Sequence, residues 1–171
     1  MTSYKTLIRE VPDFPKTGIS FKDITPLLAN PIAVSQVIKH MVEPFRDDRV
    51  DYVAAVEARG YIFGATVAYE LGVGFIPVRK AGKLPADTVS IDYSLEYGTA
   101  SLEVHADSVG IGQRVLVVDD ILATGGTIIA TIRLLERLGA VVAGVVVLGN
   151  LTELEGQKNL AGYKLVSLLN L

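Results

Sequence analysis

The stretch from Val115 to Thr127 constrains the fold more than any other part of the chain. It begins with four consecutive apolar residues, three of them β-branched, and continues directly into the adjacent carboxylates Asp119 and Asp120. Such a run is typical of a strand buried on both faces, and we expect this strand to end at Asp119. Small residues, glycines and hydroxyls follow, and an apolar helical period begins at Ile128. The pattern therefore predicts a buried strand, a tight loop and a helix.

The loop from Ala123 to Thr127 has the composition of an anion site at the start of a helix, where free N–H groups and the helix dipole favour negative charge. No Lys follows the second glycine, so a Walker loop is not indicated. The two acids lie at the end of a strand, where α/β sheets bind their ligands. A sugar phosphate suits both parts, with Asp119 and Asp120 toward ribose hydroxyls and the loop toward the 5′-phosphate. The alternative is an ordinary strand, turn and helix with a solvated acid pair.

Composition limits the class of protein. A chain of 171 residues without Cys fits one domain that contains neither disulfides nor thiolate metal sites. Mean hydropathy is +0.40, but the apolar runs are well short of the ~20 residues that span a bilayer. The net charge of −3 and a pI near 5.4 disfavour a general affinity for nucleic acid. We therefore expect a cytoplasmic protein that binds neither membranes nor nucleic acid.

Alternating apolar segments and turn signals predict the architecture. Asn30 and Pro31 mark the start of a helix, and Tyr61–Leu71 is a second helical segment. Further strands are expected at residues 50–56, 74–78, 140–148 and 163–169. The predicted fold class is α/β, with a mainly parallel twisted sheet flanked by helices. Residues 1–30, with three prolines, are predicted to form a small N-terminal hood over a core of residues 31–171.

Two further segments offer cations to an anionic ligand. Arg59 follows the strand at residues 50–56 and is well placed for a second anion; the alternative is an ion pair with an acid on the rim. Arg79, Lys80 and Lys83 form a basic loop after the strand at residues 74–78. Fixed cations there would stabilise a leaving group of high negative charge, although a solvated charge run is the simpler alternative.

Three motifs resemble those of type I phosphoribosyltransferases. Val115–Thr127 is similar at every position to their phosphoribosyl-pyrophosphate binding motif, and Phe14–Leu28 resembles the opening signature of adenine phosphoribosyltransferases. Ser-Leu-Glu-Tyr-Gly at residues 94–98 is similar to the catalytic loop of the same family. The resemblance extends from Pro12 to about Leu169. It implies an enzyme that converts adenine and phosphoribosyl pyrophosphate into AMP and pyrophosphate.

The resemblance also implies roles for individual residues. Asp119 and Asp120 would hold the ribose and stabilise an oxocarbenium-like centre. Glu96 would take the proton that adenine loses, and Tyr97 would shield the reacting centre; a solvated acid on a hairpin rim is the alternative for Glu96. The expected catalytic residues are therefore Glu96, Tyr97, Asp119 and Asp120. The expected substrate-binding residues are Ser20, Phe21, Lys22, Arg59, Arg79, Lys80, Lys83, Asp119, Asp120, Ile121, Leu122, Ala123, Thr124, Gly125, Gly126 and Thr127.

This chain departs from the family pattern at two positions. Many members carry Arg where this chain has Lys22, which removes a planar group beside the purine. Many carry Ser where this chain has Ala58, which removes a hydroxyl from the loop expected to hold pyrophosphate. The resemblance implies a cis peptide between Glu57 and Ala58 in that loop. Of the basic loop, Lys83 is expected to contact pyrophosphate directly, and some of these cations reach the neighbouring subunit's site in the family.

The resemblance implies Mg²⁺ as cofactor, bound mainly through substrate and water with no protein ligand assigned, and a homodimer. Three alternatives were weighed. A phosphoribosyltransferase for another base would share the phosphate loop but lack the N-terminal purine segment and the residue 94–98 motif. A non-catalytic regulator that senses phosphoribosyl pyrophosphate would need a DNA-binding extension, for which this acidic chain has no room. A pyrophosphokinase relative would need a nucleotide site that the sequence does not offer.

Overall fold

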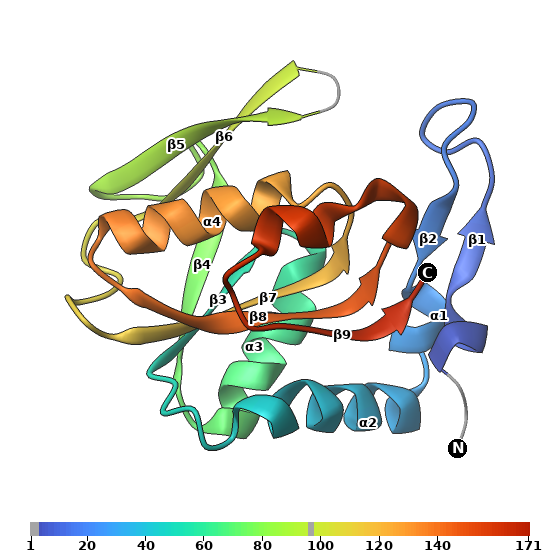
Figure 1. Ribbon diagram of the computed structural model, residues 1–171, viewed down its shortest axis with the longest axis horizontal. Coiled ribbons are helices and arrows are strands. Elements are labelled where there is room, and N and C mark those ends of the chain that lie inside the picture. The colour runs from blue at the N-terminus through green and yellow to red at the C-terminus, as the bar shows by residue number, and fades with distance from the viewer. Residues whose placement is uncertain (1–3, 96–97) are drawn as a thin grey trace.

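A computed structural model describes residues 4–95 and 98–171. Its central sheet has the strand order β5-β6-β4-β3-β7-β8-β9 (Figure 1). Five strands are parallel: β3 (Tyr52–Val56), β4 (Gly74–Lys80), β7 (Arg114–Leu122), β8 (Val141–Asn150) and β9 (Leu165–Asn170). An antiparallel hairpin, β5 (Thr88–Leu95) and β6 (Gly98–His105), continues the sheet beside β4. The predicted mainly parallel α/β fold is confirmed.

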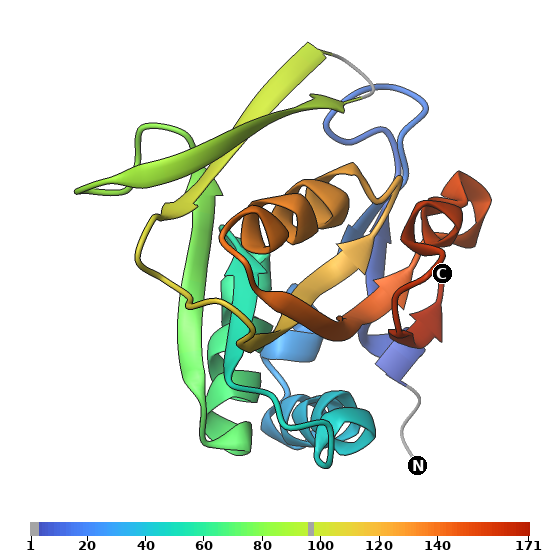
Figure 2. The ribbon, with the colours of Figure 1, turned by 60° about the vertical axis from the view of Figure 1, so that its left-hand side comes forward.

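Helices cover both faces of this sheet (Figures 1 and 2). One face packs on α4 (Gly126–Arg137), and the other packs on α2 (Pro31–Val42) and α3 (Arg59–Leu71). The predicted start of α2 is confirmed, because the Asn30 side chain accepts a hydrogen bond from the Ala33 N–H at 3.0 Å. The next element is a short 3₁₀ helix, η2 (Glu43–Phe45).

The four apolar residues at the start of β7 explain why helices are needed on both faces. Val115 and Val117 pack in the core under α4, whereas Leu116 and Val118 pack in the core under α2 and α3. Each is at most 1% exposed. Because side chains alternate along a strand, an uninterrupted apolar run requires two apolar layers. The predicted burial of this strand on both faces is confirmed.

The predicted end of this strand at Asp119 is wrong, because β7 continues to Leu122. The neighbouring strand β8 extends equally far, so that Ile121 pairs with Gly149 and Leu122 with Asn150. This pairing partner is distant in sequence and cannot be read from the local pattern. As a consequence, the acid pair lies within the last part of the strand instead of in the following loop.

The N-terminal segment forms a two-stranded antiparallel sheet beyond the carboxyl ends of β7 and β8 (Figures 1 and 2). Its elements are η1 (Tyr4–Leu7), β1 (Arg9–Val11), β2 (Phe21–Asp23) and α1 (Thr25–Leu28). An ion pair of 2.5 Å between Arg9 and Asp23 joins the two strands. Ile24 and Leu27, which follow β2, are buried against α2 and α3 and anchor the hairpin to the core.

Two further 3₁₀ helices, η3 (Thr152–Leu154) and η4 (Gly156–Leu160), connect β8 to β9. Of the two, η4 lies beside α4 (Figure 1). Across residues 4–95 and 98–171, no helix combines the length and the apolar character that crossing a membrane would require.

Candidate active site

The acid pair on β7 lies beside the N-terminus of α3. Asp120 is 4% exposed, Asp119 is half-buried, and the Asp120 N–H donates to Asp119 Oδ1 at 2.9 Å. Burial and the adjacent Asp120 carboxylate raise the pKa of Asp119 well above its ordinary value of 3.8. A Cβ at Gly60 would lie 2.8 Å from Asp119 Oδ1, so only glycine lets α3 begin this close to the carboxylate. Both acids line one cavity of about 260 Å³.

Arg59, the first residue of α3, connects the acid pair to the N-terminal hairpin. Its Nε lies 2.7 Å from Asp120 Oδ2, and its guanidinium carbon lies 5.0 Å from the centre of the Phe21 ring. Its Nη1 donates to the Lys22 carbonyl at 3.5 Å. The ion pair with an acid, weighed as the alternative for Arg59, is therefore present. The same guanidinium lines the cavity, so it is also available to an anion bound there.

The loop after β7 forms a small cradle at the start of α4. Gly125, with φ +84°, is the N-cap residue of this helix. A cavity of about 70 Å³ lies over the helix start and is lined by Asp119 and by residues 121–128. The predicted loop residues that line it are Ile121, Leu122, Ala123, Thr124, Gly125, Gly126 and Thr127. The Leu122 side chain is fully buried in the core.

The predicted strand end at residue 78 is wrong, because β4 pairs with β6 as far as Lys80, so that Arg79 and Lys80 lie in the strand and Lys83 in the loop after it. This basic loop, in which we include Arg79 and Lys80, faces a carboxylate at the end of β3. Glu57 Oε2 accepts hydrogen bonds from Arg79 Nε and Nη2 at 3.1 and 2.9 Å, and Lys83 Nζ lies 3.2 Å from Glu57 Oε1. Burial acts to raise the pKa of Glu57, but the Lys80 N–H, Arg79 and Lys83 outweigh it and lower the pKa to about 2. These contacts hold two of the three predicted cations, Arg79 and Lys83, beside Glu57, which lines the acid-pair cavity.

The peptide bond between Glu57 and Ala58 is cis, which confirms that prediction. Glu57 was predicted only as part of this turn, and its role as the partner of the basic loop was missed. No local signal marks this pairing, because Glu57 and Arg79 lie 22 residues apart at the ends of two different strands. A second cis peptide, between Phe14 and Pro15, lies in the N-terminal hairpin.

Lys80 lines a further cavity of about 510 Å³ between β3, β4 and the β5–β6 hairpin, together with Glu57, Tyr93 and Thr127. Thr127 thus lines this cavity, the acid-pair cavity and the cradle. Its hydroxyl also lies 3.5 Å from the Tyr93 hydroxyl. The three cavities therefore meet at the first turn of α4.

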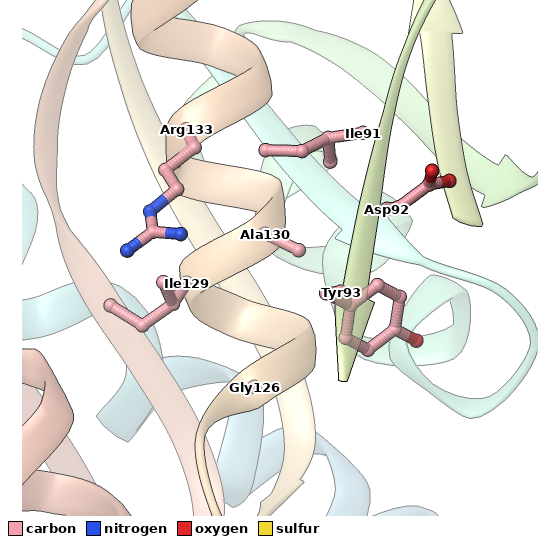
Figure 3. Close-up of a pocket in the computed structure, with 7 residues that line it drawn as sticks. All are labelled: Ile91, Asp92, Tyr93, Gly126, Ile129, Ala130 and Arg133. Carbon is pink, nitrogen blue, oxygen red and sulfur yellow. The ribbon is translucent and has the colours of Figure 1, made fainter. Parts of the chain in front are cut away.

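Tyr93 also lines a cavity of about 410 Å³ between β5 and α4, which was not predicted from the sequence (Figure 3). Ile91 points toward α4, whereas Asp92 lies on the opposite side of β5, where it accepts a hydrogen bond from the Ser101 hydroxyl. Arg133 and Ile129 line the helix side. Tyr93 therefore lines both this cavity and the one beside Lys80.

The predicted purine segment is held by a carboxylate of its own hairpin. Lys22 Nζ lies 2.6 Å from Glu10 Oε1, and the Ser20 hydroxyl donates to the same oxygen. The Phe14 and Phe21 rings meet edge to face with centroids 5.2 Å apart. Ser20, Phe21 and Lys22 therefore form one cluster, which Arg59 links to the acid pair. Glu96 and Tyr97 lie outside the described residues.

Comparison with known proteins gives the same family from sequence and from structure. A family model described as "Phosphoribosyl transferase domain" matches residues 23–165. An adenine phosphoribosyltransferase from Thermoanaerobacter sp. is 55% identical over 165 residues, which cover 96% of this chain and 95% of the relative. This chain belongs to the adenine phosphoribosyltransferase family.

Solved structures of family members agree with this assignment. The crystal structure of adenine phosphoribosyltransferase from Thermoanaerobacter pseudethanolicus superposes with a TM-score of 0.95 at 54% identity and covers 98% of both chains. The enzyme from Saccharomyces cerevisiae, complexed with D-2,5-dideoxy-2,5-imino-altritol 1,6-bisphosphate and adenine, superposes with a TM-score of 0.91 at 37% identity. That match covers 99% of this chain and 100% of the yeast chain. The phosphoribosyltransferase fold and an enzymatic activity of this class follow.

Proposed function

We propose that this enzyme transfers the 5-phosphoribosyl group of phosphoribosyl pyrophosphate to adenine, giving AMP and pyrophosphate. The observation that carries the proposal is the meeting of three cavities at Thr127. We assign the cradle at the start of α4 to the 5′-phosphate, the acid-pair cavity to the ribose, and the cavity lined by Glu57 and Lys80 to the pyrophosphate side. The yeast relative, complexed with adenine and an imino-sugar bisphosphate, supports this choice of ligand.

The ribose hydroxyls are assigned to Asp119 and Asp120. Arg59 Nε lies 2.7 Å from Asp120 Oδ2, yet this oxygen accepts no aligned hydrogen bond from the residues that the structure describes. A ribose hydroxyl would therefore have to share this buried oxygen with Arg59, whereas the half-buried Asp119 lines both the acid-pair cavity and the cradle and offers its carboxylate there. The nearby negative charge also stabilises the positive charge that develops on the sugar ring as the bond to pyrophosphate breaks.

The reaction exchanges one bond at the anomeric carbon for another. The ring nitrogen N9 of adenine forms a bond to this carbon while the bond to the pyrophosphate oxygen breaks, and the pyrophosphate leaves with the electron pair. Arg59, Arg79, Lys80 and Lys83 are assigned to the leaving group. Fixed cations lower the barrier because they stabilise charge that grows during the transfer.

Adenine is assigned to the cluster of Ser20, Phe21 and Lys22 on the hood. Glu96 is proposed to take the proton that adenine loses, with Tyr97 closing over the reacting centre. Glu96→Gln should lower the rate of the chemical step more than it weakens substrate binding. Single-turnover kinetics measures this difference, and an unchanged single-turnover rate would exclude the role of Glu96 as base.

Mg²⁺ is proposed as the cofactor, and the acid pair fits it in part. Asp119 and Asp120 offer the carboxylate oxygens that Mg²⁺ prefers, but nowhere in residues 4–95 and 98–171 do three or more His, Cys, Asp or Glu gather for a metal ion. Substrate oxygens and water would therefore complete the coordination. When bound, Mg²⁺ neutralises charge on the leaving pyrophosphate.

A homodimer is proposed from the exposed face of α3. Ile62 and Tyr69 lie seven residues apart on this helix and are 43% and 85% exposed. We expect a second copy to cover them, and light scattering after size exclusion measures the mass. A Tyr69→Glu variant should shift the mass to that of a monomer, and a wild-type monomer would contradict the proposal. The cytoplasmic location expected from the sequence stays a prediction.

A single assay tests the proposed reaction. The enzyme is incubated with Mg²⁺, phosphoribosyl pyrophosphate and, in separate reactions, adenine, guanine, hypoxanthine, xanthine, uracil or orotate. AMP from adenine is the expected product. Faster formation of another nucleotide would assign the enzyme to another base, and absence of every nucleotide would favour a regulator that only senses phosphoribosyl pyrophosphate.

A further inference from the structure

The 3₁₀ helix η4 lies against the loop of the cradle (Figure 1). The sequence pattern predicts no role for this segment. It is firmly attached to the core, because Leu160 is 2% exposed and packs in the same apolar cluster as Ile128. At its other end, the Asn150 side chain donates to the Gln157 side chain. This attachment makes η4 a rigid support and not a surface turn that happens to lie nearby.

Gly156, the first residue of η4, touches the backbone of the cradle. A Cβ at this position would lie far inside the van der Waals contact distance from the Ala123 carbonyl oxygen, and 2.9 Å from the Thr124 carbonyl carbon. On the cradle side, a Cβ at Gly125 would lie 3.0 Å from the Gly156 carbonyl oxygen. Two backbone segments therefore pack directly on each other, which requires glycine at position 156.

Asn159 supplies a hydrogen bond to the same loop from one turn further along η4. Its Nδ2 donates to the Thr124 carbonyl oxygen at 2.8 Å. In a trans peptide the carbonyl and the N–H of the next residue point in opposite directions. Because Asn159 holds the Thr124 carbonyl, the Gly125 N–H points away from η4. The contact between Gly156 and the Ala123 carbonyl orients the Thr124 N–H in the same way.

We infer that Gly156 and Asn159 are positioning residues for the 5′-phosphate. They hold the two peptide planes of residues 123–125 so that the N–H groups of Thr124 and Gly125 point into the cradle. The phosphate is thus bound by donors that are already oriented before it arrives, which favours tight binding and precise placement of the sugar. This inference rests on the proposed assignment of the cradle to the 5′-phosphate of phosphoribosyl pyrophosphate.

The experiment compares Asn159→Ala, Asn159→Asp and Gly156→Ala with the wild-type enzyme. Steady-state kinetics gives KM for phosphoribosyl pyrophosphate and for adenine, and calorimetry gives Kd for ribose 5-phosphate. We expect Asn159→Ala to raise KM for phosphoribosyl pyrophosphate and Kd for ribose 5-phosphate about tenfold, and KM for adenine at saturating cosubstrate to stay unchanged. Asn159→Asp is isosteric but places an acceptor against the Thr124 carbonyl. It should raise KM for phosphoribosyl pyrophosphate and Kd for ribose 5-phosphate further. Gly156→Ala should have the largest effect and raise these two constants about a hundredfold.

Lys158→Ala is the matched control, since this side chain belongs to η4 but is 68% exposed and pairs only with Glu155 in the described part of the chain. It should leave all three constants unchanged. The Asn159 variants should unfold within about 3 °C of the wild type, because the hydrogen bond lies at the surface. If Gly156→Ala does not fold, the two Asn159 variants still decide the question.

Thr127→Ala separates the inference from the assignment on which it rests. If this variant binds ribose 5-phosphate more weakly while the Asn159 and Gly156 variants bind it normally, the cradle assignment stands and the positioning role is overturned. If Thr127→Ala and the η4 variants all bind ribose 5-phosphate normally, the cradle assignment itself fails. An equal rise in KM for adenine and for phosphoribosyl pyrophosphate would indicate general damage to the fold and would also overturn the positioning role.

Discussion

On β7 two carboxylates are adjacent and share one guanidinium, whereas at the end of β3 a single carboxylate is surrounded by cations. The pKa of Asp119 is raised by burial and by Asp120, while that of Glu57 is lowered to about 2. The first arrangement is costly in the empty protein and the second is favourable. Repulsion at the acid pair is relieved when hydroxyls or a cation bind, so that side of the cleft is built for a ligand.

The basic loop is organised differently, because two of its three cations already share one carboxylate. Glu57 holds Arg79 and Lys83, and Glu103 Oε1 accepts hydrogen bonds from the N–H groups of Lys83 and Leu84 at 2.7 Å each. A pyrophosphate bound at the proposed place would share these cations with Glu57. We therefore expect changes at the acid pair to act mainly on turnover and changes at the basic loop to act mainly on affinity.

The sharpest test of this division is Asp120→Asn, which keeps the shape of a buried side chain and removes its charge. We expect kcat to fall by about a hundredfold or more, since both the hold on the ribose and the stabilisation of the sugar cation are lost. Asp107→Asn, in an exposed turn after β6, is the control and should behave as wild type. Unchanged turnover of Asp120→Asn would remove the assignment of the ribose to this carboxylate.

Lys83→Ala tests the other side of the cleft. Removing one charged contact should raise KM for phosphoribosyl pyrophosphate about tenfold and leave KM for adenine close to its original value. Lys39→Ala, an exposed position on α2, is the matched control. Steady-state kinetics with each substrate varied in turn measures both constants. A change confined to adenine would show that Lys83 does not contact the pyrophosphate.

The smallest effects are expected in stability, where the two sites should respond to pH with opposite signs. The raised pKa of Asp119 means that the folded chain binds the proton of this carboxyl more tightly than the unfolded chain does. The contribution of Asp119 to the free energy of unfolding is therefore most favourable at acid pH and declines as pH rises through the raised pKa. Asp119→Asn should therefore raise the unfolding temperature by a few degrees at about pH 8, and the gain should disappear on acidification.

Glu57 should behave in the reverse way. The contribution of Glu57 to the free energy of unfolding is fully present above the ordinary pKa of 4.5 and is lost as pH falls toward about 2. Glu57→Gln should therefore lower the unfolding temperature by a few degrees at about pH 8, and the loss should disappear in acid. Thermal unfolding monitored by circular dichroism at several pH values measures both variants. Parallel pH profiles would contradict the contrast between the two sites.

Local patterns were sufficient for the elements that build the sheet and its helices. An apolar run such as Val115–Val118 allows few environments, and Asn30 before Pro31 fixes a helix start by its own hydrogen bond. The cis peptide after Glu57 was expected from family resemblance and not from the pattern itself. The place of the cradle was likewise expected from the resemblance of residues 115–127 to the family motif.

Features that depend on distant partners were not predictable. The extension of β7 to Leu122 depends on pairing with β8, and the pairing of Glu57 with Arg79 depends on two strand ends meeting. The strands of the N-terminal hairpin have three residues each, too few for a periodic signal. Gly156 gives no local sign of its role, since the atoms that exclude a side chain there belong to residues 123 and 124.

Ion pairs near the cleft also affect which solutes the enzyme attracts. Arg59 pairs with Asp120, and Arg79 and Lys83 pair with Glu57. Each cation near the cleft that has a carboxylate beside it exerts little pull at a distance, so common anions such as free phosphate gain little by entering. A molecule that brings hydroxyls for the acids and phosphates for the cations at once can replace every one of these pairs. We therefore expect this pairing of charges to disfavour single anions and to favour a substrate that engages the acids and the cations together.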